Sequence, residues 1–206
     1  MKENTILIAV IALLIGGIGG YLIADKDECY MQDMDHSMMV STEDDSGSMM
    51  PMGNMAGMDH TAMMVSSERE FVVGMIPHHQ EAVDTANEVL ARGGTTEEIR
   101  TLAEGIVAAQ ETEIAMLKAW HLSWYGEDYV QNGSYQPMMR DLSQLSGADL
   151  DRRFLEDMIP HHVGAIMMAQ SVRPHIEHQE VTDMADAIME TQSAEIELMN
   201  ELLTTI

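Results

Sequence analysis

Two copies of the unit Met-Ile-Pro-His-His carry the residues of this 206-residue chain that are best suited to chemistry. They stand at Met75–His79 and at Met158–His162. In each copy the Met and both His residues continue an apolar stripe with helical spacing, so the imidazoles should face the buried side of a helix. Imidazole and thioether groups suit copper, and the soft thioether favours Cu(I). The pattern therefore predicts a copper site, which silver could occupy in vitro.

One Met-x-x-His from each copy would supply two thioethers and two imidazoles, enough for a roughly tetrahedral Cu(I) site. Adjacent His side chains point about 100° apart on a helix, so the second His of a pair need not share the same ion. It could instead orient the site or belong to another one. The predicted metal ligands are Met75, His78, His79, Met158, His161 and His162.

Buried imidazoles need partners for both ring nitrogens, and carboxylates downstream could supply them. A Gln-x-x-Glu-Ile element follows each His pair, at Gln110–Ile114 and at Gln192–Ile196. A core of His–Glu pairs without any metal is the alternative interpretation. The predicted partners or additional ligands are Gln110, Glu113, Gln192, Glu195 and Met199.

A second concentration of soft ligands lies upstream, where residues 31–64 hold 11 of the 22 methionines. The sequence Met-Asp-His of residues 34–36 recurs at residues 58–60, each time before a Met-Met pair. Thioethers bind Cu(I) without forming disulfides in an oxidising compartment. A Met-rich interaction segment is the alternative. The predicted tail ligands are Met34, His36, Met38, Met39, Met49, Met52, Met55, Met58, His60, Met63 and Met64.

The duplicated sequence also predicts the elements that position these residues. Each repeat contains two helical patterns joined by a short connection, which favours antiparallel pairing of consecutive helices. We expect an all-α fold, a four-helix bundle of two hairpins, with repeats at about 66–125 and 147–206. The predicted helices lie near residues 67–92, 96–124, 147–173 and 177–204, with a short helix near 138–145.

Local signals support these boundaries. Ser67-x-x-Glu70 and Thr95-x-x-Glu98 both read as capping boxes at helix starts. Gly93-Gly94 should end the first helix.

The N-terminal region should lie outside this domain. Residues 5–24 form an uncharged apolar run long enough to cross a bilayer, preceded by Lys2. We expect residues 1–24 to anchor the chain in a membrane, with the remainder outside the cytoplasm, in the periplasm or at the extracellular face. A cleaved signal peptide ending at Ala24, which would leave a secreted protein, is the alternative. Residues 25–65 read as a disordered, acidic Met- and His-rich linker.

Composition excludes several function classes. The formal net charge of −25 makes nucleic acid an improbable partner. A single cysteine, Cys29, rules out an intrachain disulfide. No His follows a Glu by three residues, as the Glu-x-x-His motif of di-iron bundles would require. No nucleophile constellation or phosphate-binding loop is present. Whether the protein is an enzyme stays open, and a binding role is favoured.

The doubled Met-Ile-Pro-His-His unit and the Gln-x-x-Glu-Ile elements resemble the DUF305 family over about residues 66–206. The resemblance implies a ferritin-like four-helix bundle in an exported protein, and some relatives are periplasmic copper-binding proteins. It points to the same Met and His residues of the two units. The family often has Met four residues after the Glu, where this chain has Met199 after Glu195 but Leu117 after Glu113.

Three functions follow from these patterns. The favoured one is an extracytoplasmic copper-binding protein for metal buffering, resistance or delivery, with a copper-transport or oxidase protein as a possible partner. A copper-dependent redox enzyme such as a cuprous oxidase is the second. A metal-free, membrane-tethered interaction module is the third.

Overall fold

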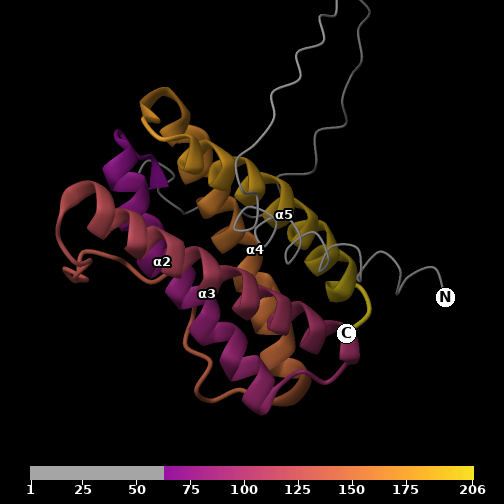
Figure 1. The fold of residues 1–206 in the computed structure, drawn as a ribbon. Coiled ribbons are helices and arrows are strands. Elements are labelled where there is room, and N and C mark those ends of the chain that lie inside the picture. Colours follow the sequence, from indigo (N-terminus) through magenta and orange to yellow (C-terminus); the bar gives the residue numbers. More distant parts are fainter. Residues whose placement is uncertain (1–62) are drawn as a thin grey trace, which may run out of the picture.

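The structure, a computed structural model, describes residues 63–206, and these form four α-helices with no strand among them (Figure 1). The all-helical prediction is confirmed for this part of the chain. The predicted membrane segment of residues 1–24, and residues 25–62 of the predicted linker, lie outside it. The elements are α2 (Glu68–Arg92), α3 (Glu97–Tyr125), α4 (Gly147–Val172), the 3-10 helix η2 (Arg173–His175) and α5 (Gln179–Leu203).

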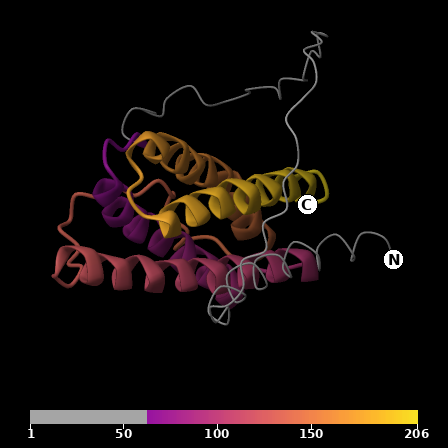
Figure 2. The ribbon, with the colours of Figure 1, turned by 45° about the horizontal axis from the view of Figure 1, so that its top comes forward.

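The helices pack as two hairpins, α2 with α3 and α4 with α5, as the short connections predict (Figures 1 and 2). The hairpins meet mainly along α2 and α4. These two helices run antiparallel, because Gly74 near the start of α2 lies against Met168 near the end of α4. Further along, Gly164 lies against His78. Glycine at both positions leaves room for the neighbouring helix to come close.

The core consists of two apolar clusters with the His pairs between them. On α2, one cluster lies mostly before the His pair, with Phe71, Val72, Met75 and Ile76, and the other lies after it, with Ala82, Ala86 and Val89. On α4 the order is reversed, since the residues before His161 join the second cluster and those after His162 join the first. Both His pairs therefore form a polar layer across the middle of the domain.

Local capping follows the sequence signals at one helix start and departs from them at another. Ser67 caps α2 by accepting a hydrogen bond from the Glu70 backbone N–H at 3.1 Å. Gly94 has a φ of +64°, which suits the end of that helix. The cap of α3 is Thr96, so the predicted capping box from Thr95 to Glu98 is wrong. The reason is that the Thr95 hydroxyl donates to Asp151 instead.

Two buried carboxylates connect the hairpins reciprocally. Asp151, near the start of α4, accepts hydrogen bonds from the backbone N–H of Gly94 at 2.6 Å and of Thr95 at 2.8 Å. Glu68, in the first turn of α2, accepts from the backbone N–H of Glu177 at 2.7 Å and of His178 at 2.9 Å. Each hairpin therefore binds the loop that joins the two helices of the other hairpin.

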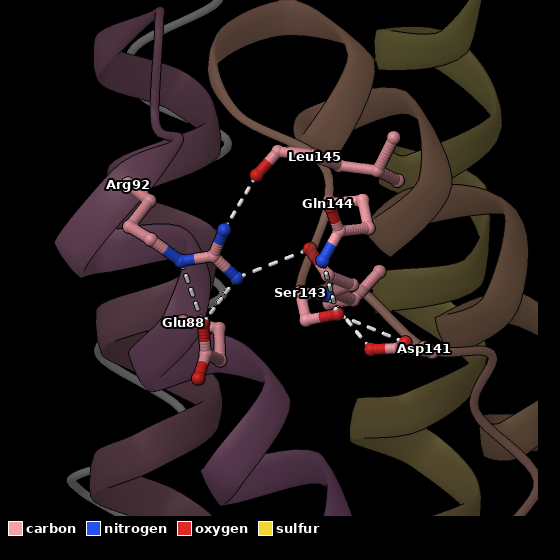
Figure 3. A network of polar contacts seen from close by, with 7 residues as sticks. Glu88, Arg92, Asp141, Ser143, Gln144 and Leu145 are labelled. Carbon is pink, nitrogen blue, oxygen red and sulfur yellow. Dashed lines mark hydrogen bonds and ion pairs between the residues drawn. The ribbon is translucent and has the colours of Figure 1, made fainter.

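The connection of residues 126–146 joins the hairpins without forming the predicted helix near 138–145, and only a turn is found there. Arg92 holds its end, donating to the carbonyl oxygens of Leu145 at 2.5 Å and Leu142 at 3.1 Å (Figure 3). Earlier in the connection, the backbone N–H groups of Met138 and Met139 donate to Glu81 of α2. The backbone N–H of Arg140 donates to Asp157 of α4.

None of the helices in residues 63–206 is both long enough and apolar enough to span a bilayer. The apolar run of residues 5–24 was predicted to do so, and it stands before the described part.

We predict that Asp151→Ala lowers the free energy of unfolding by about 3 kcal/mol, because buried N–H donors would lose their acceptor. Urea unfolding followed by circular dichroism would measure this change. The exposed Glu190 supplies a control, and Glu190→Ala should change the free energy by less than about 0.5 kcal/mol. Equal effects of the two substitutions would contradict the role assigned to Asp151.

Candidate metal centre

Four imidazoles meet where α2 crosses α4. His78 and His79 come from α2, and His161 and His162 come from α4; all four are at most 1% exposed. The inner rings, His78 and His161, have centroids 3.8 Å apart. His79 and His162 flank them, with centroids 6.1 and 6.3 Å from their respective neighbours in sequence. The structure therefore gathers the predicted His residues into one row, which we call the imidazole layer.

The two outer imidazoles have carboxylate partners within their own hairpins. His162 Nε2 hydrogen-bonds to Glu195 Oε2 of α5 at 2.7 Å. His79 Nε2 lies 2.7 Å from Glu113 Oε2 of α3, although outside the angular range of a hydrogen bond. A carboxylate beside Nε2 favours the tautomer with the proton on that nitrogen. The lone pair then resides on Nδ1, which in both rings is buried without a partner among residues 63–206.

The inner imidazoles are less well satisfied. Neither nitrogen of His78 or of His161 has a hydrogen-bond partner within the described residues. The nearest carboxylate oxygen of Glu81 is 3.6 Å from His161 Nε2. Buried polar groups are normally paired, because leaving them without hydrogen bonds costs about 1–3 kcal/mol each. Unpaired nitrogens in this number fit a ligand that binds at the edges of the rings.

The charge state of the inner pair suits metal binding. Burial lowers the pKa of His78 well below its usual value, and the neighbouring His161 ring lowers it further. Burial also lowers the pKa of His161 to about 4, although the Glu81 carboxylate opposes that shift. Both rings are therefore neutral at pH 7 and keep a lone pair available.

Glu81 was not among the predicted site residues. Its carboxylate lies between the imidazole layer and the segment of residues 126–146 that joins the two hairpins. Its carboxylate accepts hydrogen bonds from the Tyr135 hydroxyl at 2.5 Å and from the backbone N–H of Met138 and of Met139, each at 2.9 Å. Burial raises the pKa of Glu81, but His161, Tyr135 and these N–H groups outweigh it and hold the pKa at about 2. Its position three residues after His78, on the same helix face, was a signal for it.

The predicted thioether ligands do not meet at one point. Met75 is fully buried in one apolar cluster together with Met168. Met158 is fully buried in the other cluster, together with Met199. The two predicted Met ligands therefore lie on opposite sides of the imidazole layer. A single tetrahedral site with both thioethers does not match this arrangement.

The remaining predicted residues take different positions. Gln110 and Gln192 are buried, and the side-chain oxygen of each lacks a partner within residues 63–206. Met63 packs against the first cluster, whereas the side chain of Met64 is 58% exposed. The other predicted tail ligands, Met34 to His60, lie outside the described residues. In the described part, no three side chains of His, Cys, Asp or Glu already form a group that could hold a metal ion.

Acid should destabilise the metal-free fold through His161. Between pH 6.5 and about 4 the unfolded chain binds the proton that the buried ring rejects, so the free energy of unfolding falls as the pH falls. When the pH is lowered from about 7 to about 4.5, the free energy of unfolding should fall by about 2 kcal/mol more in the wild-type protein than in His161→Leu. The variant has no group at this position that binds a proton. Equal losses in urea unfolding would argue against this effect.

Comparisons with known proteins agree with this helical arrangement. CopM in its Cu(I)-bound form is 32% identical over 68% of this chain and 98% of its own, with a TM-score of 0.62. A DUF305 fragment from Deinococcus radiodurans is 29% identical, covering 69% of this chain and 99% of that one, with a TM-score of 0.60. A DUF305 protein from Streptomyces coelicolor is 28% identical over 66% and 90%, with a TM-score of 0.59.

A comparison with curated protein sequences finds no match. The family described as "Domain of unknown function (DUF305)" matches residues 24–121 and 68–203, which together cover most of the chain. The matches include both Met-Ile-Pro-His-His units, and the resemblance inferred from those units is confirmed. The chain belongs to the DUF305 family.

Proposed function

We propose that this protein binds copper outside the cytoplasm and buffers, stores or delivers it. The observation that carries the proposal is the imidazole layer, whose inner rings have no hydrogen-bond partner within residues 63–206. Neutral imidazole nitrogens are suitable ligands for both Cu(I) and Cu(II). A bound copper ion would therefore use lone pairs whose burial otherwise destabilises the fold.

The proposed ligands are the Met and His residues predicted from the sequence, but the packing distributes them over more than one site. His78 and His161 occupy the centre, and Glu113 and Glu195 leave Nδ1 of the outer rings free to bind metal. Because Met75 and Met158 lie in separate clusters, each thioether would serve a different end of the layer. The domain would then hold copper in more than one imidazole–thioether site.

The relatives support copper and silver as the metals. CopM, at 31–32% identity, has been solved in Cu(I)-bound, Cu(II)-bound and silver-bound forms. Its similarity covers 68–69% of this chain. Silver(I) resembles Cu(I) in its preference for thioethers, and it offers a probe without redox chemistry.

The location outside the cytoplasm belongs to the same proposal. Residues 5–24 would anchor the chain, and the Met-rich residues 25–65 would extend from the membrane to the domain. The Streptomyces coelicolor relative carries the provisional name of a secreted protein. A tethered tail raises the local concentration of thioethers beside the domain, which would favour copper transfer between the two and onward to a transport or oxidase protein.

Anaerobic Cu(I) titration against a competing chelator tests where copper binds. The chain from residue 25 to 206 should bind more Cu(I) than a chain that begins at Ser66, because the tail adds thioether ligands. The shorter chain should still bind Cu(I) tightly through the domain. If binding disappears with the tail, the imidazole layer is structural and the tail alone is the copper ligand.

His78→Leu separates a metal ligand from a structural residue. The substitution should lower Cu(I) affinity of the chain beginning at Ser66 at least tenfold. It should lower the free energy of unfolding of the metal-free protein by less than about 1 kcal/mol, because the lost imidazole has no partner to leave unsatisfied. His175→Leu, at an exposed position in η2, is the control and should change neither quantity. Severe destabilisation with unchanged Cu(I) affinity would contradict a ligand role.

A further inference from the structure

A short segment of the connection, residues 135–140, is fixed across the imidazole layer by both central helices. On the α2 side, Glu81 accepts the Tyr135 hydroxyl and the backbone N–H groups of Met138 and Met139. On the α4 side, Asp157 accepts the backbone N–H of Arg140 at 3.0 Å and its Nε at 2.7 Å. The backbone is thus held on both sides of Met138.

The side chain of Met138 reaches toward the inner ring that lacks a carboxylate. A side-chain carbon added to Gly164 of α4 would lie 3.2 Å from His78 Nε2 and 3.6 Å from Met138 Sδ. The nitrogen and the sulfur thus both lie beside the same position of α4, where glycine has no side chain to separate them. A metal ion bound to both atoms at roughly 2.0–2.3 Å would have to lie away from the Gly164 backbone, so the Met138 side chain would have to turn toward His78. The three rotatable bonds of methionine permit such a movement.

The two repeats differ at this place in a way that makes room for the sulfur. Aligning Phe71 with Phe154 sets Glu81 of the first repeat opposite Gly164 of the second. Glu81 is the residue beside His161, and Gly164 is the residue beside His78. One inner imidazole therefore faces a carboxylate, whereas the other faces a gap with a thioether at its edge. The same Glu81 also fixes the backbone that carries this thioether.

We propose that Met138 is a thioether ligand for a soft monovalent cation bound at His78 Nε2, and that Glu81 positions it. The proposal rests on the function proposed above and adds a ligand from outside the four helices. It predicts an unsymmetrical site, because His161 has Glu81 where His78 has Met138. Met139 is the neighbouring residue of the same chemistry, and its side chain packs on the second apolar cluster instead.

The test uses the full-length protein with 13C-labelled methionine methyl groups and labelled imidazoles, titrated with Ag(I) in a competing buffer. Substitution of each residue by Leu assigns the methyl signals of Met138 and Met139. The Met138 signal should shift together with that of His78, and the Met139 signal should stay in place. Met138→Leu should raise the Ag(I) concentration at half-saturation of His78 about tenfold, whereas Met139→Leu should leave it unchanged.

The outcomes separate this proposal from the one on which it rests. If the imidazole signals respond to Ag(I) and the Met138 signal does not, Met138 is no ligand while the domain still binds metal. If no imidazole signal of the layer responds either, both proposals fail.

Gly164→Ala provides an independent test, because it fills the gap between the two proposed ligands. Alanine is favoured over glycine inside a helix by about 0.5–1 kcal/mol, which helps the variant to fold despite the tight contact with His78. The Ag(I) concentration needed at His78 should rise at least tenfold. Unchanged silver binding would place the metal elsewhere and overturn the proposal.

A double-mutant cycle tests the positioning role of Glu81. Glu81→Gln should weaken Ag(I) binding at His78 about tenfold, because an amide cannot accept all the N–H and O–H groups that the carboxylate accepts. If Glu81 acts through Met138, adding Glu81→Gln to Met138→Leu should weaken Ag(I) binding little further. A purely structural role predicts that the two losses multiply, which would remove Glu81 from the proposal.

Discussion

Burial of four imidazoles between α2 and α4 is the constraint on which the arrangement of this domain depends. Each ring brings two polar nitrogens into a largely apolar interior, and every unpaired nitrogen opposes folding. Each outer ring has a carboxylate beside Nε2 within its own hairpin, Glu113 for His79 and Glu195 for His162, while Nδ1 of both rings stays unpaired among residues 63–206. The nitrogens of the inner rings have no hydrogen-bond partner among residues 63–206, and a soft metal ion would give them one to bind. The layer also limits how α2 can slide along α4, because a shift of one turn would place imidazoles against apolar side chains.

The features that could be predicted from the sequence are those that depend on local sequence patterns. Helical spacing, the Gly93-Gly94 stop and the duplicated units predicted both hairpins and a buried His face, and the structure has them. Glu113 and Glu195 were expected as partners for the buried imidazoles, and they lie beside His79 and His162. Each of these signals involves one helix or one hairpin, for which periodicity carries enough information.

The features that were missed depend on how one hairpin packs on the other. A sequence repeat does not say whether α2 and α4 run parallel or antiparallel, so it could not separate Met75 from Met158. Residues 138–140 bond to Glu81 and Asp157 of the two central helices, and no helix forms where one was expected. Asp151 likewise takes Thr95 out of its expected capping role. In all these cases a contact distant in sequence outweighs a local preference.

The reciprocal carboxylates have a consequence for the origin of the domain. Glu68 and Asp151 occupy equivalent places in the two repeats, and each binds the connection of the opposite hairpin. Exchange of the same contact in both directions is what an isologous interface between two identical subunits shows. The domain is thus built as a twofold dimer of one hairpin whose halves share a chain. Among residues 63–206, the long connection of residues 126–146 has no symmetry mate, and so it is free to make the two halves different.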